Sequence, residues 1–140
     1  MSGKIKNAEH FISILPHAEA LGMVVERMDE GDVTLAMPYA DHLVGDPRTG
    51  VVHGGAVSAL MDTCCGAAVM THPDNTGSTA TIDLRIEYLR AARPGQTIRA
   101  HAVCYHMTRS VAFVRATAMD DDSDIPVAKA TGTFTVEGAA

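Results

Sequence analysis

A single carboxylate lies within a long apolar segment of this sequence, TGVVHGGAVSALMDTCCGAAVM. Asp62 is the only Asp, Glu, Lys or Arg residue between Arg48 and Asp74. An unpaired charge in a protein interior is costly, so such a residue is normally absent, paired with another group or functional. As a functional group, a carboxylate in this setting could act as a general base or as a nucleophile.

The triplet His53-Gly54-Gly55 precedes the apolar segment and predicts the start of a helix. Glycines let the backbone turn sharply and let a ligand come close. The first amides of a helix have no intrahelical acceptor, so they can polarise a carbonyl oxygen. Asp62 is expected two turns further on, with Ser58 one turn before it on the same face. The Gly54 amide of one chain and Asp62 of another would make a minimal hydrolytic site.

A purely structural explanation of these residues is the alternative. Asp62 could bond a neighbouring hydroxyl group or a buried water, and the two glycines could form only a tight loop. The acid, the double glycine and the helix start taken together favour function.

Hydrophobic periodicity predicts the elements that must position these residues. The segment 55–70 is apolar on nearly all sides, which predicts a buried helix. Apolar and polar residues alternate over 79–88, which is typical of a half-buried antiparallel strand. A short amphipathic helix is expected over 5–15, ended by Pro16. Further strands are predicted for residues 22–28 and 33–38, joined by a hairpin turn, and for 96–107, 111–119 and 127–136.

These elements predict an α+β fold in which a curved antiparallel sheet wraps around one central helix. The 140 residues suit a single domain, 1–140. Because one helix leaves sheet edges exposed, a second copy of the chain is expected to pair with it in a symmetric dimer or a larger assembly.

Composition limits the possible functions. A net charge of −6 argues against nucleic acid as the main partner, because binding phosphates needs a basic face. No apolar run is expected to span a membrane, and the N-terminal residues lack the apolar core of a signal peptide. The cysteines Cys64, Cys65 and Cys104 suit no disulfide framework, so a cytoplasmic location is expected.

Several other polar groups are predicted to be structural. Cys64 and Cys65 lie in the middle of the predicted helix, where small buried thiols are expected. The seven histidines show no spacing typical of a metal site, so neither a metal nor a cofactor is expected. The acidic run DDDSD at 120–124 predicts a solvated loop.

Two segments, TGVVHGGAVSALMDTCCGAA and TATIDLRIEYLRAARPG, together resemble the hotdog-fold acyl-CoA thioesterases of the phenylacetate-pathway type. The resemblance covers most of the chain. It implies a hotdog fold, a homodimer or dimer of dimers, and hydrolysis of an acyl- or aryl-CoA thioester to the free acid and CoA.

The resemblance also implies roles for individual residues. Asp62, nine residues after the HGG histidine, occupies the position of the catalytic acid. Gly54 occupies the position whose backbone amide polarises the thioester carbonyl. Thr81 stands where a Ser or Thr orients the water or the acid across the dimer. His53 could act as a catalytic base, whereas in the family this histidine mainly shapes the loop.

The sequence departs from the family pattern before the histidine. The family usually has an Asn six residues earlier, where this chain has Pro47. Asp46 is the nearest candidate for that catalytic role, although a carboxylate cannot donate a hydrogen bond as an amide does.

Arginines at strand ends and turns lie where the family receives the nucleotide end of CoA, and arginine forks suit phosphates. A scattered, solvated rim of arginines is the alternative. Met61 and Met70 are expected beside an acyl pocket. The predicted substrate-binding residues are Gly55, Ser58, Arg90, Arg93, Arg109 and Ser110.

Two other functions stay open at this point. A hotdog-fold dehydratase would act on hydroxyacyl thioesters, but it relies on a differently placed pair of a histidine and an acid. A non-catalytic acyl-CoA-binding module would explain the missing Asn.

Overall fold

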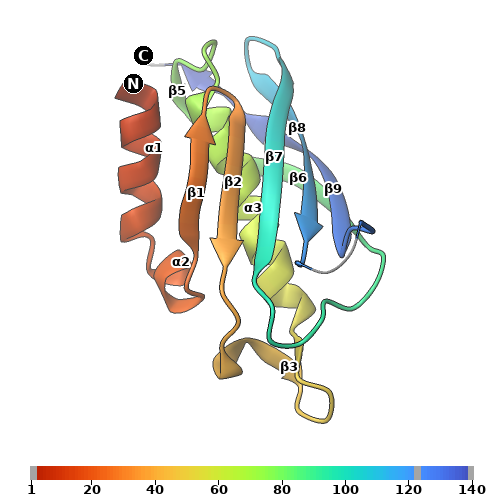
Figure 1. Ribbon diagram of the computed structural model, residues 1–140. Coiled ribbons are helices and arrows are strands. Elements are labelled where there is room, and N and C mark those ends of the chain that lie inside the picture. Colours follow the sequence, from red (N-terminus) through yellow and green to blue (C-terminus); the bar gives the residue numbers. More distant parts are fainter. Residues whose placement is uncertain (1–2, 122–123, 139–140) are drawn as a thin grey trace.

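The structure, a computed structural model, describes residues 3–121 and 124–138. A six-stranded antiparallel sheet curves around one long helix (Figure 1), with strands in the order β1–β2–β7–β8–β9–β6. The predicted α+β architecture is therefore confirmed. The strands are β1 (Val24–Asp29), β2 (Asp32–Met37), β6 (Thr81–Tyr88), β7 (Ile98–Met107), β8 (Val111–Met119) and β9 (Ala128–Thr135).

The central helix α3 (Gly54–Thr71) extends the predicted helix by one residue at each end. It fills the concave side of the sheet, and α1 (Gly3–Ile14) packs beside it (Figure 1). Pro16 follows the end of α1 and also begins the short helix α2 (Pro16–Ala20). A proline is favourable at the first position of a helix. Among the described helices, none combines the length and the apolarity needed to cross a membrane.

Four further strands were not expected from the sequence. β3 (Val44–Asp46) pairs with β4 (Val51–Val52), and β5 (Gly77–Ser78) pairs with β10 (Glu137–Gly138). Each is too short for periodicity to reveal. A 3-10 turn, η1 (Asp41–Leu43), leads into β3.

Strand β6 is less buried than its alternating pattern predicts. It lies at the end of the sheet order, so it pairs on one side only, with β9. Leu84 and Ile86 pack against the core, whereas Ile82 is 56% exposed and Tyr88 is 50% exposed. The prediction of half-burial was wrong for these outer positions, because a single chain provides nothing to cover the ends of the strand.

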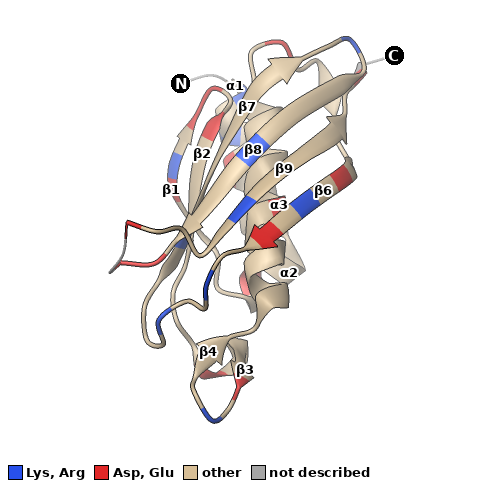
Figure 2. Cartoon of the chain, turned by 90° about the vertical axis from the view of Figure 1, so that its right-hand side faces the viewer, with Lys and Arg blue, Asp and Glu red and all other residues tan. Residues whose placement is uncertain are grey.

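The outer face of β6 carries alternating charges, Asp83, Arg85 and Glu87 (Figure 2). An apolar inner face beside a free backbone edge is a template for pairing with another strand.

Strand β9 approaches β6 closely at Gly132. A Cβ atom at this position would lie 2.7 Å from the Asp83 carbonyl oxygen and 2.8 Å from Leu84 Cδ1. We expect Gly132→Ala to push the strands apart and to lower the free energy of unfolding by about 1–3 kcal/mol. Denaturant unfolding followed by circular dichroism would measure the loss.

The matched control is Gly66→Ala on α3. A Cβ atom there would meet only Phe134 Cε2, at 3.8 Å, which is an ordinary contact. Equal unfolding free energies for the two variants would contradict the packing argument.

Candidate active site

Asp62 and Thr81 form the polar pair at the centre of the candidate site. The Thr81 hydroxyl donates a hydrogen bond of 2.8 Å to Asp62 Oδ1. Helix α3 presents the carboxylate on the side that meets the start of β6, where Asp62 is only partly buried. The lone acid therefore faces a hydroxyl group and open space rather than the packed interior.

The open space is a cavity of about 310 Å³ between α1, α3 and the segment 77–81, which we call the Asp62 cavity. Met70 lines it as expected, whereas Met61 is fully buried in the core. The contributions of α1 and of Phe134 were not predicted, because no local pattern indicates which side chains meet across the fold. The lining residues are Phe11, Ile12, Leu15, Asp62, Thr63, Gly66, Ala67, Met70, Gly77, Ser78, Thr79, Ala80, Thr81 and Phe134.

His53 caps the N-terminus of α3. Its backbone is extended, with φ −59° and ψ 134°, and its Nδ1 accepts a hydrogen bond of 2.8 Å from the Gly55 amide. The Gly55 N–H is thus engaged by the cap, while the Gly54 N–H opens the helix without an intrahelical acceptor. The Ser58 hydroxyl donates back to the Gly54 and Gly55 carbonyls, at 3.1 and 3.2 Å.

The far end of β6 holds this helix start in place. The Tyr88 hydroxyl donates a hydrogen bond of 2.7 Å to the Gly54 carbonyl, and its ring lies beside the Gly54 backbone. Gly54 and Tyr88 also border a second hollow of about 290 Å³, which we call the Gly54 hollow. Sequence analysis missed the role of Tyr88, although Tyr88 belongs to the segment that carries the family resemblance.

The two ends of the candidate site lie apart within one chain. Gly54 and Asp62 are eight residues apart on the same helix, which corresponds to about 12 Å along its axis. A single carbonyl group cannot contact both the Gly54 amide and the Asp62 carboxylate of one chain.

Asp46 lies in the β3–β4 hairpin. Its carboxylate accepts hydrogen bonds from the backbone and the side chain of Arg48, at 3.0 to 3.3 Å. Within one chain this carboxylate stabilises the hairpin turn. A catalytic role for Asp46 stays a prediction.

The Arg90 guanidinium is held by groups of its own chain. It forms two hydrogen bonds of 2.7 Å with Asp120, whose side chain is fully buried. Its other donors bond the Ile125 and Ala91 carbonyls, so all five N–H groups are engaged. A contact of Arg90 with CoA stays a prediction. The solvated loop predicted for 120–124 is wrong for Asp120, and residues 122–123 of that run lie outside the described residues.

The other substrate-binding candidates lie at two ends of the sheet. Arg93 is exposed in the loop after β6, near the Gly54 hollow. Arg109 and Ser110 lie in the β7–β8 turn, and the nine residues of β8 put that turn about 30 Å from the Arg90–Asp120 pair. One chain does not bring Arg93 and Arg109 together.

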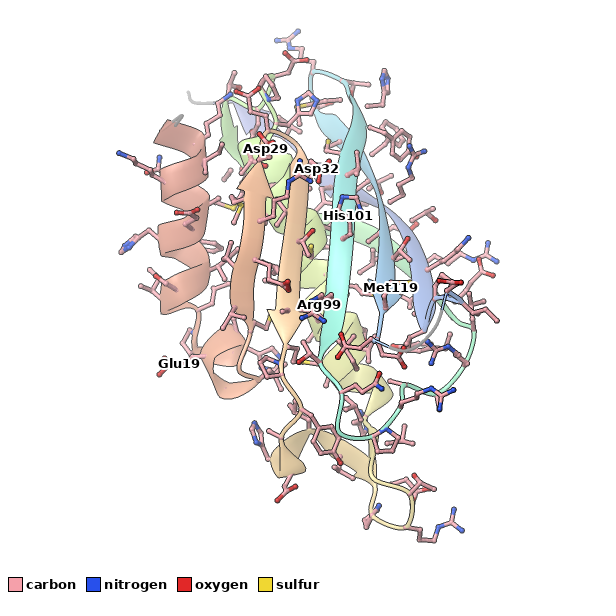
Figure 3. The ribbon with its side chains drawn as sticks, in the orientation of Figure 1. Glu19, Asp29, Asp32, Arg99, His101 and Met119 are labelled. Carbon is pink, nitrogen blue, oxygen red and sulfur yellow. The ribbon has the colours of Figure 1, made fainter. Side chains whose placement is uncertain are left out.

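Charged groups on the outer face of the sheet pair with one another (Figure 3). Arg99 contacts Glu26 and Asp121, at 2.7 and 2.6 Å, and His101 Nε2 lies 2.7 Å from Asp32 Oδ1. This face is turned away from α3 and from the Asp62 cavity. Among the residues that the structure describes, no group of His, Cys, Asp and Glu could hold a metal ion.

Comparison with known proteins adds to this geometry. A model of the thioesterase superfamily matches residues 49–127. A putative esterase of Halobacterium salinarum, VNG_1336C, is 35% identical over 83% of this chain and 81% of its own length. The medium/long-chain acyl-CoA thioesterase YigI of Escherichia coli K12 is 28% identical over 91% of this chain and 90% of its own. A solved structure from Pseudomonas aeruginosa has a TM-score of 0.83 at 39% identity, covering 94% of this chain and 98% of that one.

The Arg90–Asp120 pair yields a prediction about stability. We expect Arg90→Met to lower the midpoint of thermal unfolding by about 5 °C or more, because it leaves the buried Asp120 carboxylate without its counter-charge. Arg93→Met is the matched control, because only the Arg93 backbone N–H contacts Asp120, at 3.0 Å. An unchanged midpoint in Arg90→Met, accompanied by a higher KM for a CoA thioester, would support a ligand role for Arg90.

The helix cysteines yield a second prediction. Burial raises the pKa of Cys64 to about 12 and also raises the pKa of Cys65, so both stay protonated and unreactive near neutral pH. We expect a maleimide at about pH 8 to leave both thiols unmodified in the native protein, as measured by mass spectrometry. Both should react in denaturant, where the ordinary pKa of 9.0 applies. Rapid native labelling of Cys64 or Cys65 would contradict their burial.

Proposed function

Because this chain belongs to the thioesterase superfamily, we propose that it hydrolyses acyl-CoA thioesters to the free acid and CoA. The observation that carries the proposal is the Asp62 carboxylate, held by Thr81 in the wall of a mainly apolar cavity. A carboxylate is the group that this hydrolysis needs, either to activate water or to attack the carbonyl.

The active site is proposed to form between two copies of the chain. The separation of about 12 Å between Gly54 and Asp62 along α3 requires that the amide come from a second chain. The free edge of β6 supports this arrangement, because Ile82, Tyr88 and Leu89 leave an apolar margin exposed there. A homodimer is therefore part of the proposed catalytic unit, and two dimers could associate further.

Strand β6 explains how a dimer would align the site. Thr81, which holds Asp62, begins the strand, and Tyr88, which holds Gly54, ends it. If two β6 edges pair antiparallel about a twofold axis near the strand centre, the start of each strand meets the end of the other. Each Asp62 then lies beside the partner's Gly54, which gives two equivalent sites.

In this site the thioester carbonyl oxygen accepts a hydrogen bond from the Gly54 N–H of one subunit. That bond stabilises the negative charge that develops on the oxygen during attack. As a base, Asp62 of the other subunit takes a proton from water while the hydroxide forms a bond to the carbonyl carbon. The C–S bond then breaks, and the proton passes to the CoA thiolate. As a nucleophile, Asp62 would bond to the carbonyl carbon, and the C–S bond would break to release the CoA thiolate. Water would then hydrolyse the resulting anhydride to the free acid and the Asp62 carboxylate, and the proton released would pass to the thiolate.

The proposal also covers the cellular location of the protein and its type of thioesterase. The three cysteines, Cys64, Cys65 and Cys104, are free thiols, which fits the reducing cytoplasm. The narrower resemblance to phenylacetate-pathway thioesterases stays a prediction. So do the predicted substrate contacts of Gly55, Ser58, Arg90, Arg93, Arg109 and Ser110.

Mixed dimers test both the chemistry and the shared site. We expect Asp62→Asn and Gly54→Pro each to abolish thiol release from an acyl-CoA, since one removes the base and the other removes the N–H donor. Proline suits the first helical position, and the extended His53 backbone suits a residue before proline. Dimers with one chain of each variant, isolated through two affinity tags, should recover about half of wild-type activity, because one of two sites is intact.

The reciprocal dimer is the control. A chain carrying both substitutions, paired with a wild-type chain, should be inactive, because each site then lacks one group. If this dimer were half active and the dimer with one chain of each variant were inactive, both groups would act within one chain, and the shared site would be overturned. Thiol release by Asp62→Asn alone at the wild-type rate would remove Asp62 from the mechanism.

A further inference from the structure

We propose that the Asp62 cavity receives a straight saturated acyl chain of up to about ten carbons, and that the absence of a side chain at Gly66 lets the chain pass the midpoint of the cavity. The inference rests on the proposed thioesterase function. It assigns the cavity to the acyl group and leaves CoA to the other side of Asp62.

The cavity follows α3 for more than two turns. Asp62, Gly66 and Met70 are spaced by four residues, so they form one stripe along the helix. The stripe is about 12 Å long at a rise of 1.5 Å per residue. An extended chain advances about 1.2 Å per bond, so this length holds about ten carbons.

The opposite wall runs antiparallel to the helix. Thr81 bonds Asp62 at one end of the cavity, and Gly77 lies at the other end, where it borders a neighbouring hollow together with Met70. The hydroxyl oxygen of Thr79, between these ends, is itself buried. The depth of the cavity therefore runs from Asp62 toward the C-terminal end of α3.

Phe11 and Ile12 of α1, together with Leu15 just after it, form the remaining wall. Lys4 fixes the start of α1, because its ammonium group donates to the carbonyls of His72, at 3.2 Å, and Pro73 at the end of α3. The wall formed by α1 is therefore anchored to the end of α3, and an apolar chain between the two helices would bury apolar surface against them.

Gly66 lies halfway along this stripe and has space in front of it. A Cβ atom there would meet only Phe134 Cε2 within 4 Å, at 3.8 Å. A larger side chain would project into the cavity one helical turn, about 6 Å, beyond Asp62. The remaining depth would hold about five carbons.

The experiment compares thiol release from butyryl-, hexanoyl-, octanoyl-, decanoyl- and phenylacetyl-CoA by wild type, Gly66→Val and Gly66→Ala. We expect kcat/KM of the wild type to rise about fourfold per methylene up to about ten carbons. Gly66→Val should lose tenfold or more with decanoyl-CoA while staying within about threefold with butyryl-CoA. Gly66→Ala adds one methyl group without a clash, so its kcat/KM with decanoyl-CoA should lie between those of the wild type and Gly66→Val.

Two further measurements separate the possible failures. Phe11→Ala changes the other wall on an exposed position of α1, and it should also lose activity selectively with decanoyl-CoA. Calorimetry with non-hydrolysable thioether analogues of butyryl- and decanoyl-CoA measures chain-length preference without catalysis.

The outcomes distinguish the two proposals. If no thioester is cleaved but the decanoyl analogue binds more tightly and Gly66→Val removes that preference, the cavity assignment holds and the proposed function fails. If thiol release occurs but Gly66→Val lowers all substrates equally, the cavity assignment is overturned and the proposed function holds. A wild-type preference for phenylacetyl-CoA over octanoyl-CoA would also overturn the assignment.

Discussion

The rigidity of one helix governs the organisation of this protein. Because α3 fixes the Gly54 amide and the Asp62 carboxylate about 12 Å apart, no rearrangement of loops can bring them to one carbonyl group within a chain. A helix N-terminus polarises an oxygen only at its tip, and an acid two turns away lies beyond that reach. The proposed chemistry therefore makes association of two chains a requirement of the site as well as a source of stability.

Strand β6 connects the proposed site to the edge through which two chains would associate. It bonds Asp62 through Thr81 at its start and Gly54 through Tyr88 at its end, so it fixes both of the proposed catalytic groups relative to one free edge. The loop after β6 is held by the Arg90–Asp120 pair, which ties it to the end of β8. Arg90 therefore keeps the end of this strand in place.

The sequence predicted the helices and strands that have strong local patterns. It did not predict contacts between residues that are far apart in the chain. The apolar run gave α3 within one residue at each end, and β8 was predicted with its observed bounds, because periodicity is a local property. The burial of Asp120 was missed, since an acidic run is typical of solvent and its partner Arg90 lies 30 residues earlier. The α1 wall of the cavity was missed for the same reason. The family resemblance singled out Thr81 but placed its action across the dimer, whereas its contact with Asp62 lies within one chain.

Gly66 lowers the stability of α3 but leaves space in the Asp62 cavity. A glycine within a helix costs about 1 kcal/mol relative to alanine. Packing does not require this glycine, because an alanine Cβ would fit at 3.8 Å from Phe134 and the backbone there does not have positive φ. Close packing elsewhere does require glycine, as at Gly132, where an added Cβ would strike the backbone of β6. A helix position that gives up stability without relieving a clash, and that borders a hollow beside a carboxylate, is explained by the space that it leaves for a ligand.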